Sequence, residues 1–277
     1  MTDARHASDD VLHRADNGVL WITLNRPDTG NAMTQAMRNQ IADWLDEASA
    51  DPLVRCVVIT GTGEKGFCTG ADLRGGRIQP PPRPEGVPER IVGDAARMIR
   101  TGWQRLVASI LDCEKPVIAG VNATAAGGGM HLALACDLVI MAEEARFIEV
   151  FVRRGIAPDA GGAYLLTRLV GPQKAKELFF FGDDVPAAEA LRIGIANRVV
   201  PRAELEKTLV EWAERLASGP TKAIGFAKWL TNRSLDSDRH GAFWDEGYAQ
   251  ELTNTTEDST EGMRAFAERR SPEFKGW

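Results

Sequence analysis

Short runs of apolar and β-branched residues recur along the first 200 positions of the chain and predict buried strands. These runs are Val11–Ala15, Val19–Leu24, Val54–Thr60, Pro116–Val121 and Asp137–Ala142. The first two are joined around Asp16-Asn17-Gly18, and Asn-Gly between apolar runs favours a hairpin. The chain is therefore expected to begin with two antiparallel strands and to continue with three further strands.

Helical spacing of apolar residues fills much of the remaining chain. Met33, Met37, Ile41 and Leu45 lie four apart and predict a helix at about Thr34–Ala48. Further helices are expected up to about Leu111, at Gly127–Cys136, at Ala160–Val170 before Gly171-Pro172, and at Glu204–Leu216, Thr221–Thr231, Phe243–Leu252 and Glu261–Arg270. This order predicts one α/β domain over residues 1–200 and a helical region over 201–277.

The segment Arg74–Pro88 differs from its surroundings because it contains five prolines and several glycines. Such a composition fits neither a regular helix nor an interior strand. We expect a mobile loop there, and a candidate lid over a ligand.

Composition and charge narrow the classes of partner. Hydrophobic residues make up 44% and charged residues 26% of the 277 positions, an ordinary balance for a soluble globular protein. The formal net charge of −6 argues against a nucleic-acid or anionic-membrane surface. No window approaches 18 uninterrupted apolar residues, so no membrane span is expected.

The four cysteines and four histidines form no pattern typical of a disulfide framework or a metal site. There is no CxxC pair and no HxxxH spacing, so reduced thiols and no metal are predicted. Met1–Asp10 is polar and lacks the apolar core of a signal peptide. The expected location is the cytoplasm.

Two glycine-containing motifs carry the chemical argument. Gly66–Leu73 (GFCTGADL) follows a predicted strand, and Ala125–His131 (AAGGGMH) stands at a predicted helix start. Glycines at a helix N-terminus expose unpaired N–H groups and let another molecule approach the backbone. A second N–H from the turn after Gly70 would complete a two-donor oxyanion hole. Tight helix–strand packing explains such glycines equally well, and GxGxxG is not matched, so a dinucleotide site is not expected.

Four motifs in order make the resemblance specific. These are LNRPDTGNAM (Leu24–Met33), GFCTGADL (Gly66–Leu73), Lys115–Ile140 and Gly155–Gly171. Together they resemble the crotonase (enoyl-CoA hydratase/isomerase) superfamily over roughly Val11 to Pro201. The resemblance implies a crotonase-like spiral of ββα units, acyl-CoA thioester substrates, no tightly bound cofactor, and a homotrimer or dimer of trimers. The helical C-terminal region would be the oligomerisation region, and the N–H groups of Ala71 and Gly128 would be the oxyanion donors.

The resemblance also bears on the type of reaction. The two glutamates of family hydratases fall here on His131 and Phe151, so ordinary two-glutamate hydration is not expected. Asp159 instead matches the proton-shuttling aspartate of the isomerase branch typified by epoxyphenylacetyl-CoA isomerase. From the residues alone, Asp159 before a helix is explained as an N-cap. We expect a thioester enolate held by Ala71 and Gly128, with Asp159 moving the proton.

Other candidates carry weaker signals. His131 lies one helical turn after Gly128 and either orients substrate or is a satisfied core histidine. Glu149 is expected at the surface or an interface, and Cys68 as a packed residue rather than a nucleophile. The expected substrate-binding residues are Arg26, Ala71, Asp72, Leu73, Gly127, Gly128 and Phe151, with Arg26 near the phosphates. Arg74, Arg77 and Arg83 could add phosphate contacts, and Trp103 and Tyr164 are candidates for the pocket wall.

Three alternatives to the isomerase stay open. A hydratase would use His131, Glu149 or Asp159 to manage water, and a hydrolase or C–C lyase of the same superfamily would use His131 and Asp159. A catalytically silent acyl-CoA-binding protein is compatible with the same fold, because fold does not fix function.

Overall fold

The five apolar runs of the sequence lie in one six-stranded sheet, whose sixth strand was not predicted. The computed structural model describes residues 9–74, 84–88 and 91–277. Its large sheet has the order β1-β2-β3-β5-β7-β10, and every neighbouring pair after the first is parallel. The strands are β1 (Val11–Asp16), β2 (Val19–Leu24), β3 (Cys56–Gly61), β5 (Val117–Val121), β7 (Leu138–Ala142) and β10 (Arg198–Val200). Asn17 and Gly18 both have positive φ, so the predicted Asn-Gly hairpin between β1 and β2 is confirmed.

A second, smaller sheet was not visible in the hydrophobic pattern. It has the order β4-β6-β8-β9, with β4, β6 and β8 parallel and β9 antiparallel to β8. Its strands are β4 (Gly66–Cys68), β6 (Thr124–Ala126), β8 (Arg146–Ile148) and β9 (Asp184–Pro186). Each is three residues long, which is too short for alternation to be recognised in the sequence.

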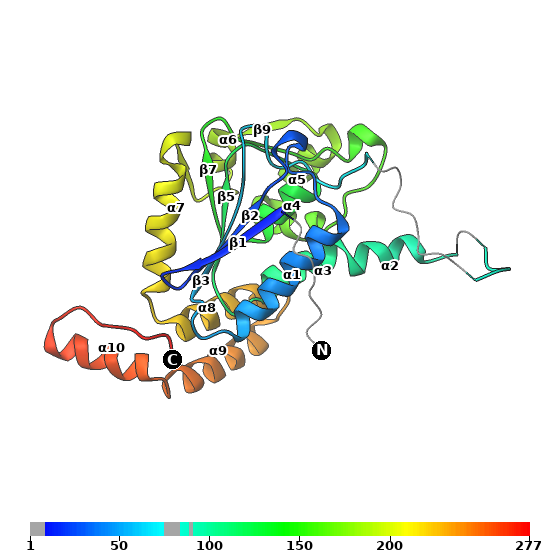
Figure 1. Cartoon of the computed structure of the whole chain (residues 1–277). Coiled ribbons are helices and arrows are strands. Elements are labelled where there is room, and N and C mark those ends of the chain that lie inside the picture. Colours follow the sequence, from blue (N-terminus) through cyan, green and yellow to red (C-terminus); the bar gives the residue numbers. More distant parts are fainter. Residues whose placement is uncertain (1–8, 75–83, 89–90) are drawn as a thin grey trace.

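The two sheets alternate along the chain in the ββα repeat that the resemblance implied (Figure 1). A strand of the large sheet is followed by a strand of the small sheet and then by a helix. Thus β3 and β4 precede α2 (Asp94–Thr101) and α3 (Trp103–Asp112), while β5 and β6 precede α4 (Gly128–Ala135). β7 and β8 precede α5 (Gly162–Phe181). All eight residues of α4 are buried, as expected for a helix that is apolar on every side.

Several helices differ in extent from the prediction. α1 (Gln35–Ala50) agrees with it, and the Thr34 hydroxyl accepts a hydrogen bond from Met37 N–H at the helix start. The long helix expected up to Leu111 is divided at Gly102 into α2 and α3. α5 continues to Phe181, but Gly171 has φ 77°, so the predicted interruption at Gly171-Pro172 is confirmed. Most of the expected Arg74–Pro88 loop lies outside the described residues.

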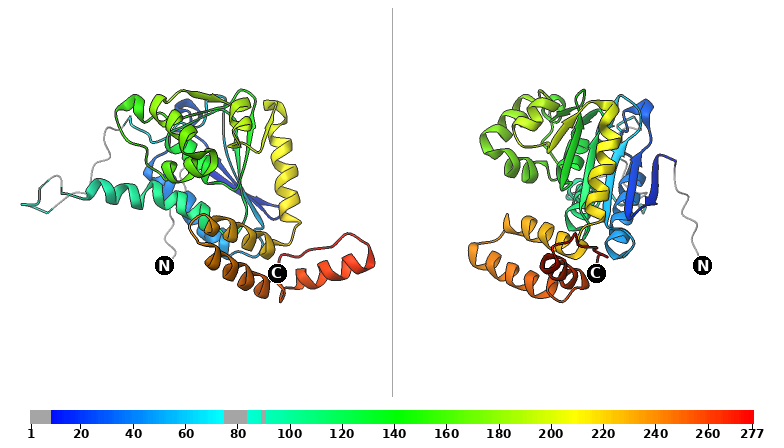
Figure 2. Two further views of the ribbon diagram at one scale, coloured as in Figure 1. Left: turned by 180° about the vertical axis from the view of Figure 1, so that it is seen from behind. Right: turned by 90° about the vertical axis from the view of Figure 1, so that its left-hand side faces the viewer.

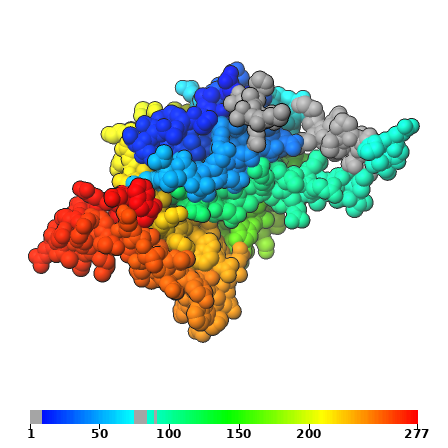
Figure 3. All heavy atoms as spheres, turned by 60° about the horizontal axis from the view of Figure 1, so that its bottom comes forward, coloured from blue at the N-terminus to red at the C-terminus, as the bar shows by residue number. Residues whose placement is uncertain are grey.

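The last third of the chain is helical, as predicted. After α6 (Ala187–Arg192), α7 (Arg202–Ala217) packs along the large sheet. α8 (Thr221–Ser234), α9 (Arg239–Thr253) and α10 (Glu257–Glu268) lie beyond one end of the sheets (Figures 1 and 2). α10 and the C-terminal residues project as a lobe (Figure 3). Within the described residues, none of the helices has both the length and the apolar character that a membrane span requires.

Candidate active site

Three segments meet at one edge of the small sheet. Strands β4, β6 and β8 are parallel neighbours, so the residues that follow them leave the sheet on the same side. These residues are Thr69–Ala71 after β4, Gly127–Gly128 after β6 and Glu149–Phe151 after β8. The topology thus brings both glycine motifs of the sequence together with the segment that contains Phe151.

The backbone around Ala71 is fixed by a short parallel bridge to Met33. Met33 N–H donates to Gly70 O at 2.8 Å, and Asp72 N–H donates to Met33 O at 3.1 Å. In such a bridge the central residue directs its own N–H away from the partner strand. Ala71 N–H therefore points to the side opposite Met33, which leaves it available to a ligand.

The two expected oxyanion donors lie on adjacent backbone segments. Gly70 has φ 93°, and a Cβ atom placed on it would lie 3.0 Å from Ala126 O and 3.7 Å from Gly128 N. Gly127 has φ 55° and precedes the first residue of α4, so Gly128 N–H belongs to the unpaired first turn of that helix. The arrangement suits a two-donor site for a developing negative charge.

The glycines also permit close packing, which was the other explanation from the sequence. A Cβ atom on Gly128 would lie 2.7 Å from the ring of Trp103, and one on Gly129 would lie 1.9 Å from Cys68 O. Trp103 is 6% exposed and its ring packs against Gly128 as part of the core, so its place in a pocket wall stays a prediction. Both explanations of the glycine motif are therefore compatible with the structure.

The side chain of Asp159 is not a helix cap. α5 begins at Gly162, its N-cap residue is Gly161, and no side chain caps it. Asp159 contributes only its backbone carbonyl, which accepts from Gly162 N–H at 3.0 Å. Ala160 and Gly161 follow with φ 51° and φ 76°, so two left-handed residues separate Asp159 from the helix. The N-cap interpretation of Asp159 is wrong, because the helix starts too late in the sequence.

The Asp159 carboxyl is half-buried beside charged groups. Burial raises the pKa of Asp159, while the nearby His131 and Arg38 lower it in part and Glu149 adds to the increase. A carboxyl group with a raised pKa is a stronger base when ionised, so its environment suits proton transfer.

His131 and Glu149 form a buried pair next to this carboxyl group. His131 Nε2 lies 2.9 Å from Glu149 Oε1 and 3.1 Å from Oε2. Their exposed fractions are 0% and 1%, and His131 Nδ1 has no hydrogen-bond partner. The surface or interface position expected for Glu149 is therefore wrong. Charged residues buried to this extent are almost always paired, and His131 supplies the partner.

The His131 ring is enclosed from two sides. Phe151 stacks on it with ring centroids 5.2 Å apart and an interplanar angle of 13°. A Cβ atom on Gly162 would lie 2.0 Å from His131 Nε2, so only glycine fits there. Phe151 thus packs against His131, the other residue that the resemblance aligned with a hydratase glutamate.

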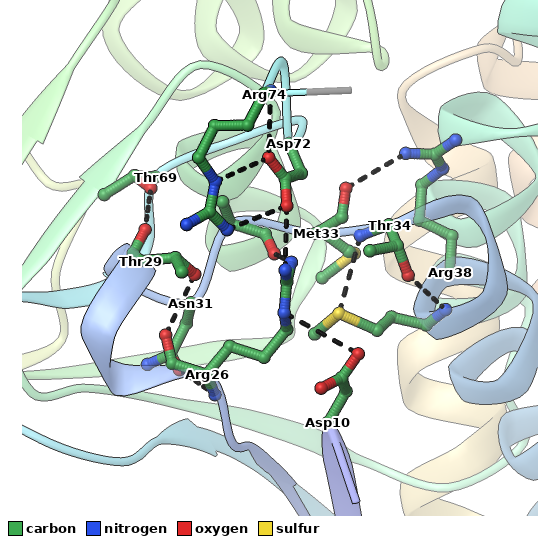
Figure 4. Close-up of polar contacts among 12 residues, drawn as sticks. Asp10, Arg26, Thr29, Asn31, Met33, Thr34, Arg38, Thr69, Asp72 and Arg74 are labelled. Atoms are coloured by element: carbon green, nitrogen blue, oxygen red, sulfur yellow. Dashed lines mark hydrogen bonds and ion pairs between the residues drawn. The ribbon is translucent and has the colours of Figure 1, made fainter. Parts of the chain in front are cut away.

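Arg26 and Asp72 form an ion-paired cluster beside the Ala71 backbone (Figure 4). Arg26 Nη2 lies 2.8 Å from Asp72 Oδ2, and Arg26 Nη1 donates to Ala32 O. Asp72 also pairs with Arg74, and these arginines hold the pKa of Asp72 well below its usual range. Arg26 therefore holds the residue that follows Ala71, and its expected place near the phosphates stays a prediction. Leu73 is 53% exposed.

The remaining candidate residues are packed, are hydrogen-bonded away from the site, or lie outside the described residues. Burial raises the pKa of the Cys68 thiol to about 12, so it is protonated at neutral pH, in agreement with a packed residue. Tyr164 donates to Asp236 at 2.6 Å on the side of the C-terminal helices. Arg77 and Arg83 lie outside the described residues. In the part of the chain that the structure describes, no three His, Cys, Asp or Glu side chains are placed to hold a metal ion.

Sequence analysis missed one charged residue of this region. Arg38, in the first turns of α1, is 3% exposed, and its guanidinium lies over the Trp103 ring at 5.1 Å from the centroid. No motif marked it, because Arg is common on helix surfaces. The one signal was its position beside Met37, on the predicted apolar face of the helix.

Comparisons with known proteins place the chain in a family and agree with its fold. A sequence model of the family described as enoyl-CoA hydratase/isomerase matches residues 14–277. The 1,2-epoxyphenylacetyl-CoA isomerase of Escherichia coli strain K12 is 34% identical over 267 residues, which cover 96% of this chain and 98% of that protein. The short-chain-enoyl-CoA hydratase of Clostridium acetobutylicum is 36% identical over 263 residues, with coverages of 95% and 96%. The crystal structure of an enoyl-CoA hydratase from Bacillus anthracis superposes with a TM-score of 0.87 at 32% identity, covering 97% of this chain and 100% of that one.

Proposed function

Because the chain belongs to the enoyl-CoA hydratase/isomerase family, we propose that it is an isomerase of enoyl-CoA or related acyl-CoA thioesters with Asp159 as proton shuttle. The observation that carries this proposal is the state of Asp159. Its carboxyl group is half-buried, caps no helix, and has a raised pKa next to the His131–Glu149 pair. Phe151 stands where a hydratase glutamate is expected and cannot transfer a proton.

The proposed reaction uses groups from three turns of the spiral. The thioester oxygen accepts hydrogen bonds from Ala71 N–H and Gly128 N–H, which stabilise the enolate more than the ground state. Asp159 removes a proton from the α or γ carbon and, after exchange of its carboxyl proton with solvent, returns a proton to another carbon, so the double bond moves and nothing is added. One carboxylate suffices for this shuttle.

The coenzyme A part of the substrate would lie along Ala71–Leu73. Arg26 supports this segment because its ion pair with Asp72 fixes the backbone next to Ala71. We propose that this is its main role, with any phosphate contact made from the same place. No resident cofactor is needed for the proposed reaction.

The buried His131–Glu149 pair favours hydration as a second candidate function. A carboxylate bound to His131 Nε2 is a typical way to orient an imidazole that acts as a base. In that case His131 Nδ1, which has no partner, would face the attacking water. Burial of the ring between Phe151 and Gly162 speaks against this role and supports the isomerase.

The experiment that tests the proposal is mass spectrometry of a panel of enoyl-CoA thioesters after incubation in D2O. We expect deuterium uptake or a shifted double bond in the wild-type protein and neither in Asp159→Asn, with no gain of water. A water adduct that persists in Asp159→Asn and disappears in His131→Gln would establish the hydratase instead. Release of free CoA would indicate a hydrolase, and tight binding without any reaction would indicate a silent binder.

We further propose that the C-terminal helices form the interface of a homotrimer or dimer of trimers. On α9, Trp244, Tyr248 and Leu252 recur four residues apart and are 55–56% exposed. On α10, Met263 and Phe266 are 73% and 85% exposed. Large apolar side chains this exposed on adjacent helices are typical of a surface that another subunit covers.

A further inference from the structure

Arg38 is a buried cation with almost no hydrogen bonds of its own. Its guanidinium can donate five N–H groups. Among the described residues it makes one hydrogen bond, a long one of 3.5 Å from Nη1 to Met33 O (Figure 4). Its Nε is inaccessible and has no partner. No carboxylate lies within 4.0 Å of it in the described part of the chain, in contrast to Arg26 on the other side of Met33.

The position of Arg38 places it at the candidate active site. Its guanidinium lies over Trp103, and the Trp103 ring lies against Gly128, the proposed oxyanion donor. Burial lowers the pKa of Arg38, and the charges of Asp159 and then Cys68 offset part of this effect. The cation is thus next to the reacting groups without being paired to any of them.

An arginine in this state is costly to the fold. Burying a charge without a close counter-charge is unfavourable, and contact with an aromatic face offsets only part of that cost. The aromatic face also leaves the in-plane N–H groups unbonded. The planar fork of N–H groups matches a carboxylate, which would accept two parallel hydrogen bonds.

We propose that Arg38 binds a carboxylate on the acyl group, so that the substrates of this site are acyl-CoA thioesters of dicarboxylic acids rather than plain hydrocarbon acyl-CoAs. The inference rests on the proposed function only in that the site binds acyl-CoA. The substrate carboxylate would supply the missing counter-charge and accept from the unpaired N–H groups. Arg38 is then a specificity residue, and Asp159 keeps its role in proton transfer.

Calorimetric titration with saturated ligands tests this inference without any turnover. Matched pairs differ only in a terminal carboxylate in place of a methyl group: malonyl-CoA against propanoyl-CoA, glutaryl-CoA against pentanoyl-CoA, and adipoyl-CoA against hexanoyl-CoA. In the wild-type protein we expect at least one dicarboxylic ligand to bind about tenfold more tightly than its matched hydrocarbon ligand. One charge-assisted hydrogen bond contributes a difference of this size. The three chain lengths locate the carboxylate along the acyl group.

Three variants separate recognition from folding. Arg38→Met is expected to lose the preference, to bind the hydrocarbon ligands within about twofold of wild type, and to melt at the same or a higher temperature. Arg38→Lys should keep part of the preference, because it retains the charge without the fork. Arg105→Met removes an arginine paired with Asp43 away from the site. It should leave the preference for dicarboxylic ligands and the affinity for hydrocarbon ligands unchanged.

Two results would overturn the inference. One is a wild-type protein with no preference in any pair. The other is an Arg38→Met variant that weakens all six ligands equally, which would assign Arg38 to packing. Failure of the isomerase proposal is separable, because it would appear as missing deuterium exchange while the binding preference remained.

Discussion

At the scale of one residue, the position of Asp159 relative to α5 decides whether its carboxyl group caps the helix or is free for proton transfer. An aspartate two positions nearer to α5 would cap the helix, whereas Asp159 stands before two left-handed residues and caps nothing. Its ionisation is instead governed by burial and by His131 and Arg38. Predictions about single side chains follow from these surroundings.

Replacement of Asp159 by Asn should abolish proton exchange without destabilising the fold. The raised pKa means that the carboxylate lowers stability as pH rises through that pKa, so removing the charge leaves stability at pH 7 equal or higher. Thermal melting and the D2O assay measure both effects. Substantial loss of stability in Asp159→Asn would show a structural role.

The pH dependence of turnover should report the same group. A general base must be ionised, so activity should rise with pH through the Asp159 pKa, which burial raises from the ordinary value of an aspartate. His131→Gln removes the interaction that lowers this pKa, so its acidic limb should move to higher pH. A limb that stays in place in His131→Gln, measured as kcat against pH, would contradict the electrostatic contact.

The Glu149 and His131 side chains should be thermodynamically coupled. Chemical denaturation of Glu149→Gln, His131→Gln and the double variant gives their coupling energy. We expect about 1–3 kcal/mol for this buried pair, since each single change leaves an unpaired polar group. The partly exposed pair Arg105–Asp43 serves as control and should show a smaller coupling.

At the scale of elements, the short strands position the loops of the site, whereas the C-terminal helices depend on specific contacts with the body. The three-residue strands β4, β6 and β8 add little core, but their parallel pairing places three loops at one edge. Among the side chains that join α8 to the body, one is a buried lysine. Lys228 Nζ lies 2.9 Å from Asp137 Oδ2 and donates to Ile110 O and Lys115 O.

Loss of Lys228 should therefore weaken the attachment of α8. Lys228→Met leaves the partly buried Asp137 without its counter-charge, and breaking a fully buried ion pair costs about 3–5 kcal/mol, so a loss of up to that size is expected. Denaturant titration measures this loss, and hydrogen exchange should show it first in α8. Lys222→Met, on the same helix but in an exposed pair with Glu114, should be almost neutral.

For the whole molecule, the prediction concerns the exposed apolar residues of α9 and α10, which the proposed oligomer would cover. The C-terminal helices lie outside the two-sheet body, so their apolar residues are not covered by it (Figure 2). Trp244→Glu combined with Phe266→Glu should convert an oligomer into monomers, because buried charge opposes assembly. Sedimentation velocity distinguishes the species. Leu53→Glu, 77% exposed before β3, is the control and should leave the assembly intact.

The sequence predicted the five longer strands, most of the helices and the family of this protein because those features are local, whereas it did not predict the three-residue strands. A run such as Val54–Thr60 or the spacing of Met33, Met37 and Ile41 depends only on neighbours along the chain. The glycine motifs likewise predicted that two backbone N–H groups are presented, since positive φ at Gly70 and Gly127 is a property of glycine itself.

Only the tertiary structure decided which charged groups meet. Residues from α1, α3, α4 and the loops before α5 meet at the site. His131 pairs with Glu149, Arg38 lies over Trp103, and the Asp159 carboxyl group caps no helix. Residues that far apart come together through strand pairing and helix packing, and burial then sets their pKa values. No local pattern contains that information, because the energy of a charge depends on what surrounds it in space.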